Sequence, residues 1–188
     1  MNRSMVLPAD WDALVGQLLA AARGRRLVVL LDGGSGAGKT TLAQELHAGL
    51  EHDLGRTQLV SLDDVYPGWG GLAAASDWVW QQILHPTRPG YPRWDWQEHR
   101  PAGRQALDPQ LPIIVEGCGT LSRASAPLAT TSLWYEMSPA TRRERALSRD
   151  GETFRPHWDA WAAQEAEHWR RNRPWEFADV IVRHSGLD

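Results

Sequence analysis

A glycine-rich segment near the N-terminal third carries the residues whose types and spacing best fit a chemical role. Residues 33–40 read Gly-Gly-Ser-Gly-Ala-Gly-Lys-Thr and fill the pattern G-x-x-x-x-G-K-[ST]. Glycines let the backbone turn so that successive N–H groups face phosphate oxygens. Lys39 is expected to reach the β- and γ-phosphates of a nucleotide, and the Thr40 hydroxyl is expected to bind Mg²⁺. The predicted nucleotide-binding residues are Gly33, Gly34, Ser35, Gly36, Ala37, Gly38, Lys39, Thr40 and Thr41.

The flanking segments supply the context that this motif requires. Residues 27–31 form a short, continuous apolar run, which is typical of a strand buried on both faces of a parallel sheet. Residues 40–50 have helical periodicity, so a helix N-terminus is expected beside the phosphates. A glycine-rich turn that matches the motif by chance is the alternative. The strand–loop–helix context favours a phosphate-binding loop that holds ATP and Mg²⁺.

Two carboxylates, Asp63 and Asp64, follow the next predicted strand, residues 58–62. Residues just past the carboxyl end of a parallel strand line the crevice where ligands bind. A carboxylate there can accept a proton from an attacking hydroxyl or hold a metal through water. The alternative is that Asp63 or Asp64 only caps a helix, and position alone does not separate the two interpretations.

A further carboxylate, Glu116, ends the apolar strand predicted over residues 112–115. An acid in this place resembles the Walker B arrangement, which usually carries Asp, and Glu116 is expected to serve Mg²⁺ through a water. The alternative is an ordinary carboxylate at the end of a strand, exposed to solvent.

Three arginines, Arg142, Arg145 and Arg149, recur at i, i+3 and i+7 and therefore share one face of a predicted helix. Converging guanidinium groups can clamp a phosphoryl group and neutralise the charge of its transition state. The alternative is a solvated face with salt bridges to Glu144 and Asp150, and spacing alone favours it.

The long segment 66–108 is rich in Trp, Pro, Gly and Arg and only weakly periodic, which is typical of a binding insert. Asp95 lies between Trp94 and Trp96, so it is suited to bind a sugar diol while a tryptophan stacks on a flat ring. Alternatively, the tryptophans anchor the insert and Asp95 is a turn residue. The predicted substrate-binding residues are Asp64, Tyr66, Arg93, Trp94 and Asp95.

The elements that must position these residues alternate between strands and helices. Further strands are predicted at 132–136 and 179–182, and helices at 8–23, 76–84, 140–149 and 157–171. The pattern predicts an α/β fold, a three-layer αβα sandwich on a mostly parallel, five-stranded sheet. We expect one domain over residues 1–188, with an acceptor-binding insert at 66–108 and a lid at 139–156.

Bulk composition excludes several classes. The net charge of -3 gives no electrostatic case for binding nucleic acid or an acidic membrane surface. The single cysteine, Cys118, excludes an internal disulfide framework and suits a reducing compartment. No apolar run has the length of a membrane span. We therefore expect a cytoplasmic protein, a monomer or homodimer, whose partner is a small molecule.

The order of these motifs resembles the uridine kinase-like branch of the P-loop kinases, which also includes phosphoribulokinase and bacterial pantothenate kinase. In that branch a strand ends D-[SD]-F-Y, a later strand ends V-E-G, and a lid helix reads R-x-x-R-R-x-x-R-D. The segments at 63–66, 115–117 and 142–150 look like these, with Val65 in place of Phe and Ala146 where an arginine is common. The resemblance spans roughly residues 27–150.

The resemblance implies roles for individual residues. Asp63 would be the general base, and Arg145 and Arg149 would close over the phosphates with Lys39. Tyr66 would line the acceptor pocket. The segment 85–96 does not match the nucleoside-binding pattern of uridine kinases. Arginines in the insert, such as Arg93, would suit an acidic acceptor.

The leading hypothesis is an ATP-dependent kinase that phosphorylates a hydroxyl of a nucleoside-like molecule. The alternative is a nucleotide-dependent switch or regulatory ATPase without a small-molecule acceptor. The chain lacks the N-K-x-D motif of GTPases and the L-S-G-G-Q signature of ABC proteins. A degenerate protein that only binds nucleotide is disfavoured by the intact Gly-Lys-Thr and by Asp63.

Overall fold

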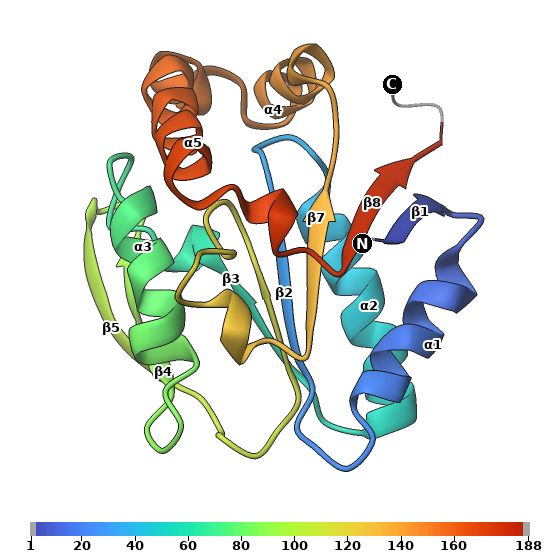
Figure 1. Ribbon diagram of the computed structural model, residues 1–188. Coiled ribbons are helices and arrows are strands. Elements are labelled where there is room, and N and C mark those ends of the chain that lie inside the picture. The colour runs from blue at the N-terminus through green and yellow to red at the C-terminus, as the bar shows by residue number, and fades with distance from the viewer. Residues whose placement is uncertain (1–2, 186–188) are drawn as a thin grey trace.

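The central element of the computed structural model, which describes residues 3–185, is a six-stranded parallel sheet (Figure 1). Its strand order is β1-β8-β7-β2-β6-β3. The bounds are β1 Arg3–Leu7, β2 Val28–Gly33, β3 Gln58–Ser61, β6 Ile113–Glu116, β7 Thr131–Tyr135 and β8 Val180–His184. Strand β2 lies between β6 and β7, so its carboxyl end is at the middle of the sheet, where the predicted phosphate loop begins.

The prediction of five strands misses β1. This edge strand pairs in parallel with β8, from Arg3 opposite Val180 to Leu7 opposite His184. Its burial alternates at its carboxyl end, with Met5 and Leu7 buried and Val6 between them exposed. A five-residue edge strand of this kind lacks the continuous apolar run that identifies the buried strands.

Helices cover both faces of the sheet and complete the predicted three layers. Helices α1 (Trp11–Ala21) and α2 (Lys39–Leu54) pack on one face, over a core that includes Leu14, Leu18 and Leu46. Helices α3 (Leu72–Trp78) and α5 (Trp158–Asn172) lie on the opposite side (Figure 1). Burial of these apolar side chains, at roughly 25 cal/mol per Å², stabilises the sandwich.

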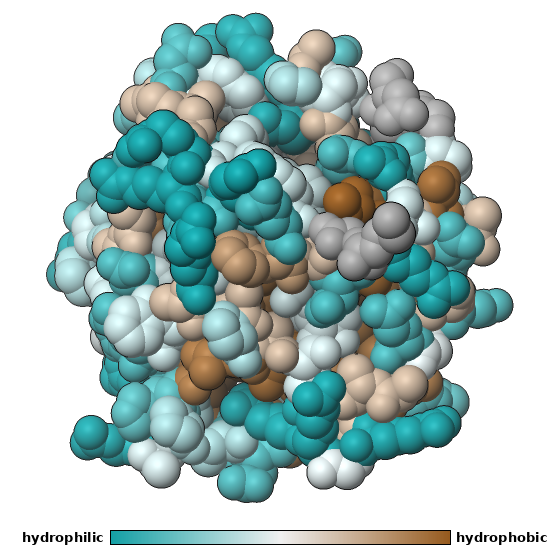
Figure 2. Space-filling view, in the orientation of Figure 1, coloured by the Kyte–Doolittle hydropathy of each residue, from teal (hydrophilic) through white to brown (hydrophobic). Residues whose placement is uncertain are grey.

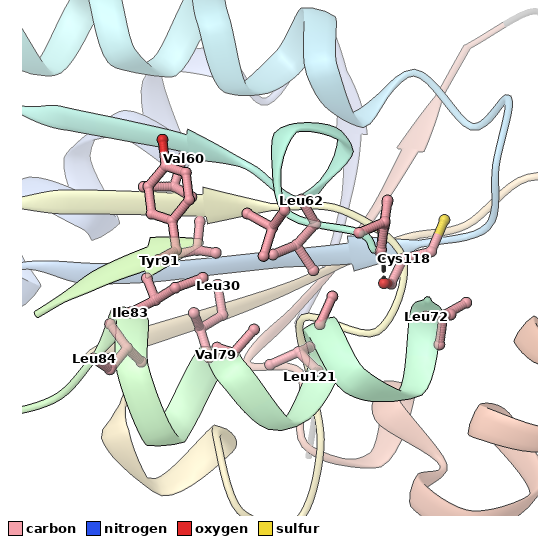
Figure 3. Close-up of a cluster of buried hydrophobic side chains, with 14 of the residues drawn as sticks. Leu30, Val60, Leu62, Leu72, Val79, Ile83, Leu84, Tyr91, Cys118 and Leu121 are labelled. Carbon is pink, nitrogen blue, oxygen red and sulfur yellow. Dashed lines mark hydrogen bonds between the residues drawn. The ribbon is translucent and has the colours of Figure 1, made fainter. Parts of the chain in front are cut away.

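The second core is shown in Figure 3. Side chains from the strands, including Leu30 and Val60, contact Val79 and Ile83 of the helical segment beneath them, and Tyr91 closes one end. All five side chains are at most 7% exposed. This packing joins the insert firmly to the sheet.

The insert contains structure that the sequence analysis did not predict. Strands β4 (Gly90–Asp95) and β5 (Arg100–Ala106) form a separate antiparallel hairpin. All of β5 is exposed, and proline and glycine interrupt both strands, so period-two alternation is absent. The helix expected over 76–84 begins earlier, as α3, and continues into a π-helical turn, η2 (Val79–Ile83).

Helix α4 (Pro139–Phe154) lies beyond the carboxyl ends of the strands (Figure 1). Ser138 caps it by accepting a hydrogen bond from the Thr141 N–H. The helix is longer than the predicted 140–149 and is interrupted at Gly151, which has φ of 53°. Short 3₁₀ turns complete the chain: η1 Leu62–Asp64, η3 Ala126–Leu128, η4 Arg155–His157 and η5 Pro174–Glu176.

The face of the molecule seen in Figure 2 is mostly polar, with small, separated apolar patches. None of the helices between residues 3 and 185 is long and apolar enough to cross a membrane.

Candidate active site at the carboxyl edge of the sheet

The glycine-rich loop joins β2 to α2 and forms the floor of a cavity of about 460 Å³. Gly38 has a φ of 103° immediately before α2, a conformation that side chains with a Cβ rarely adopt. Helix α2 begins at Lys39, so its N-terminal N–H groups lie at the cavity, as an anion site requires. The predicted residues that line it are Ser35, Gly36, Gly38, Lys39, Thr40 and Thr41. Gly33 and Gly34 instead pack against Tyr135 and Arg142, and Ala37 is buried.

Lys39 is held against the loop. It is 7% exposed, and its Nζ donates to the Gly34 carbonyl at 3.1 Å and contacts Cys118 Sγ at 3.5 Å. Burial by itself would lower the pKa of Lys39, but the surrounding acidic groups, which include Glu116 and Glu165, raise it above its ordinary value. The ammonium group is therefore charged at neutral pH and available to a phosphate.

Glu116 joins two elements at the cavity. Its Oε1 accepts hydrogen bonds from Thr40 Oγ1 at 3.1 Å and from Ser61 Oγ at 2.6 Å. The side chain is 2% exposed, and burial raises its pKa while Lys39 acts in the opposite direction. A hydroxyl and a carboxylate at this edge fit Mg²⁺, which usually keeps several waters and takes few protein ligands. No group of three or more His, Cys, Asp or Glu residues that could hold a metal ion occurs in residues 3–185.

Asp63 lies in the 3₁₀ turn η1, which follows β3 directly. It lines the phosphate-loop cavity together with Lys39. The Asp63 side chain is exposed at the cavity. Partial loss of solvation raises the pKa of its carboxyl group, and the positive charges of Lys39 and Arg149 lower it. Asp64 is exposed and interacts electrostatically with Tyr91 of the hairpin. The two neighbouring carboxylates therefore face different surroundings.

The three arginines of α4 have separate environments. Arg145 and Arg149 line the phosphate-loop cavity. Arg149 also binds Asp150 through two hydrogen bonds of 2.7 and 2.6 Å, an adjacent pairing that the sequence analysis offered as its alternative. Arg142 is 7% exposed and lies behind the loop, where it pairs with Glu165 at 3.1 Å. Only two of the three are placed to reach a phosphate.

A second cavity of about 380 Å³ opens beside the first. Aromatic side chains form much of its wall: Tyr66, Trp69, Trp96, Phe154 and Trp161. Its polar lining residues are Ser35, Asp63, Arg149 and Asp150. Because three of these, Ser35, Asp63 and Arg149, also line the phosphate-loop cavity, the two cavities meet at these residues. We call it the aromatic cavity.

Hydrogen bonds and ring packing fix the aromatic walls. The Tyr66 hydroxyl donates to the Cys118 carbonyl at 2.8 Å, and its ring meets that of Trp161 edge to face, with centroids 4.8 Å apart. Trp69 stacks on His157 at 4.4 Å. These contacts hold the rings of the wall against one another.

The predicted substrate-binding residues of the hairpin lie elsewhere. Asp95 accepts hydrogen bonds from the N–H groups of Gln97 and Glu98, so it stabilises the hairpin turn and does not line the aromatic cavity. Arg93 is exposed. Trp94 packs toward Gly68. Among the substrate-binding residues expected from the sequence, Tyr66 is the one in the cavity wall.

Several site residues were not predicted. Trp69 and Phe154 come from segments with no recognisable motif. Asp150 was named as the last residue of the lid-helix motif and as a salt-bridge partner, but not as a cavity residue, and Trp96 was named only as an alternative stacking ring. Glu165 carried one usable signal: it lies with Trp158, Trp161 and His168 on the buried face of α5, where an unpaired acid would be costly.

Comparison with solved structures identifies the architecture. The chain superposes on "possible uridine kinase" from Bacillus stearothermophilus with a TM-score of 0.66, at 20% identity over 94% of this chain and 98% of that one. It superposes on "putative fructose transport system kinase" from Silicibacter sp. TM1040 with a TM-score of 0.59, at 22% identity over 90% and 97%. The chain has the fold of the P-loop kinases. No protein-family model matches it, and no curated protein matches it in sequence.

The P-loop kinase fold confirms the predicted αβα sandwich and the resemblance stated for residues 27–150. In this fold the glycine-rich segment occupies the position between the central strand β2 and helix α2. The likeness to the possible uridine kinase extends over 94% of this chain and 98% of that one, so it covers nearly the whole fold.

Proposed function

We propose that this chain transfers the γ-phosphoryl group of ATP to a hydroxyl of a small, nucleoside-like molecule bound in the aromatic cavity. One observation carries the proposal: Asp63 lies where the phosphate-loop cavity and the aromatic cavity meet. A carboxylate between a phosphate site and a second binding site can contact the hydroxyl that attacks the phosphate. Arg149 lines both cavities as well and can balance charge at that point.

The proposal assigns a role to the loop and to the charged residues of the phosphate-loop cavity. The loop N–H groups and Lys39 bind the phosphates, and Thr40 with Glu116 would hold Mg²⁺, which supplies positive charge to the phosphate oxygens. Arg145 and Arg149 stabilise the charge of the transition state. Asp63 orients the acceptor hydroxyl and accepts its proton as the new O–P bond forms; the bond from the γ-phosphorus to the β,γ-bridging oxygen breaks in the same step, and ADP leaves. Catalysis then consists mainly of positioning and charge stabilisation.

The aromatic cavity supports a nucleoside-like acceptor. Its ring walls suit a flat, apolar group, and its volume lies within the range of ordinary small-molecule sites. Asp150, at the same wall, offers carboxylate oxygens for sugar hydroxyls. Tyr66 lines this cavity and is therefore a proposed acceptor-binding residue.

The test is release of ADP from ATP and Mg²⁺ in the presence of nucleosides, nucleotides, vitamin alcohols and antibiotic alcohols. Strong stimulation by one acceptor, lost in Lys39→Ala and in Asp63→Asn, supports the proposal. Slow hydrolysis that no acceptor stimulates, in a protein that binds ATP, contradicts it and indicates a regulatory ATPase.

A further inference from the structure

Both backbone polar groups of Ser35, near the start of the phosphate loop, form hydrogen bonds with buried side chains. Its N–H donates to Glu165 Oε1 at 2.7 Å, and its carbonyl accepts from Arg142 NH1 at 3.1 Å. The same Arg142 NH1 donates to Glu165 Oε2 at 3.1 Å, which closes a ring of three hydrogen bonds. One residue of the loop is thus fixed by side chains of α4 and α5.

The ring of hydrogen bonds is shielded from water. Glu165 is 1% exposed and Arg142 is 7% exposed. A carboxylate and a guanidinium buried this deeply must be paired and hydrogen-bonded, because either charge alone would be expensive. The pairing with the Ser35 peptide satisfies both groups and gives them a fixed geometry.

The glycine pattern of the loop accommodates this arrangement. A Cβ at Gly34 would lie 2.0 Å from Arg142 NH1, so any side chain there would displace the guanidinium. Arg142 therefore lies directly against the loop backbone, outside the phosphate-loop cavity, and lines a separate cavity together with Gly34. The absence of a side chain at Gly34 therefore leaves the space that the Arg142 guanidinium occupies.

Glu165 also contacts Cys118, which lines the phosphate-loop cavity. Its Oε1 accepts from Cys118 Sγ at 3.2 Å, and Cys118 contacts Lys39 Nζ at 3.5 Å. The Glu165 carboxylate is one of the groups that favour the charged form of Lys39. A single carboxylate on α5 thus touches the loop backbone directly and Lys39 through the thiol.

We propose that Glu165, paired with Arg142, is a positioning residue that holds the phosphate loop in its phosphate-binding shape before the nucleotide arrives. Loop N–H groups that converge on an empty anion site repel one another, and an unrestrained glycine-rich loop would lose much backbone freedom when phosphate binds. Fixing the loop in advance removes that entropic cost from the binding step. The inference rests on the proposed nucleotide binding, because it concerns affinity for nucleotide phosphates.

The test measures binding of Mg²⁺–ADP by calorimetry, which requires no acceptor. Because Glu165→Ala leaves Arg142 unpaired and can prevent folding, the main variant is the charge-neutral pair Glu165→Leu with Arg142→Met. We expect the dissociation constant to rise about tenfold or more, the effect of losing charge-assisted hydrogen bonds to the loop. Glu167→Gln on the exposed part of the same helix, where Glu167 pairs with Arg170 and Arg171, is the matched control and should bind as the wild type does.

A second readout separates positioning from general stability. Lys39 is the only lysine in the chain, so lysine labelled with ¹³C gives one side-chain signal. In the double variant, we expect the chemical shift of this signal to differ from that of the wild type, because Cys118, which contacts Lys39 Nζ, loses its hydrogen-bond acceptor Glu165. Loss of stability alone would reduce the fraction of active protein without changing the dissociation constant or the chemical shift of the folded fraction.

Each outcome has one meaning. A folded double variant that binds Mg²⁺–ADP within about twofold of the wild type overturns the inference. If the double variant does not fold, Arg142→Lys decides in the same way, since it keeps the buried charge but cannot supply the guanidinium fork. A wild-type chain that binds neither Mg²⁺–ADP nor Mg²⁺–ATP contradicts the proposed function itself.

Discussion

The indole N–H of Trp96 donates a hydrogen bond of 2.7 Å to the backbone carbonyl of Asp63. Trp96 follows the last residue of β4, and Asp63 lies in the turn after β3. The contact therefore ties the hairpin to the proposed general base. The same tryptophan forms part of the wall of the aromatic cavity. Trp96 therefore contacts the backbone of Asp63 and lines the proposed acceptor site.

Replacing Trp96 by Phe should weaken acceptor use and leave nucleotide binding intact. A smaller aromatic ring is retained, while the hydrogen bond, worth about 0.5–1.5 kcal/mol, is lost together with part of the packing on Trp69. We expect kcat/KM for the acceptor to fall roughly 2- to 10-fold, measured by ADP release. Trp80→Phe is the control, since Trp80 is 39% exposed on the turn η2. Equal losses in both variants would argue against a specific role for the Trp96 bond.

Replacing Asp63 by Asn should remove the proton acceptor without removing a phosphate ligand. General-base catalysis contributes about 10²–10⁴-fold, so we expect kcat to fall by that factor while the dissociation constant for Mg²⁺–ATP stays near the wild-type value. Asp64→Asn, an exposed neighbour outside both cavities, should retain nearly full activity. Turnover close to normal in Asp63→Asn would exclude Asp63 as the base.

The activity should decline in acid as Asp63 is protonated. The surrounding protein raises the pKa of Asp63 above its ordinary value of 3.8, and Arg149 partly counteracts the shift. A base acts only when ionised, so the acidic limb of kcat/KM against pH should have its midpoint above 3.8. Arg149→Gln should move that midpoint to higher pH, because a positive charge that favours the carboxylate is gone. A midpoint that stays in place or moves lower would refute the assignment.

The thiol of Cys118 should be slow to react in the folded protein. Burial raises its pKa well above the usual range, which leaves the neutral thiol at pH 8, and the side chain is 5% exposed. The thiolate is the reactive form, so we expect alkylation by iodoacetamide to be at least about tenfold slower than in urea-unfolded protein. Comparable rates in the two states would show that the loop around Lys39 opens readily.

The sequence by itself predicted the fold class, which the solved structures confirm, and the residues of the proposed nucleotide site. Residues 33–40 carry their own geometry, because the glycines, the lysine and the helix that follows are local in the chain. The apolar runs of β2 and β6 predicted a buried parallel sheet, and a parallel sheet brings Asp63 and Glu116 to the same edge as the loop. These features follow from local patterns and from a single topological rule.

The tertiary structure alone decided which side chains complete the site. The sequence left two interpretations of Trp94 and Asp95 open, acceptor binding or anchoring of the insert with Asp95 in a turn. In the structure Asp95 holds the hairpin turn, and Trp96 lines the aromatic cavity. Likewise, Arg142 has the helical spacing of a phosphate clamp, yet it lies behind the loop with Glu165, 23 residues away. The physical reason is that side-chain direction at a bulged hairpin and pairing between distant helices depend on packing, which no local pattern encodes.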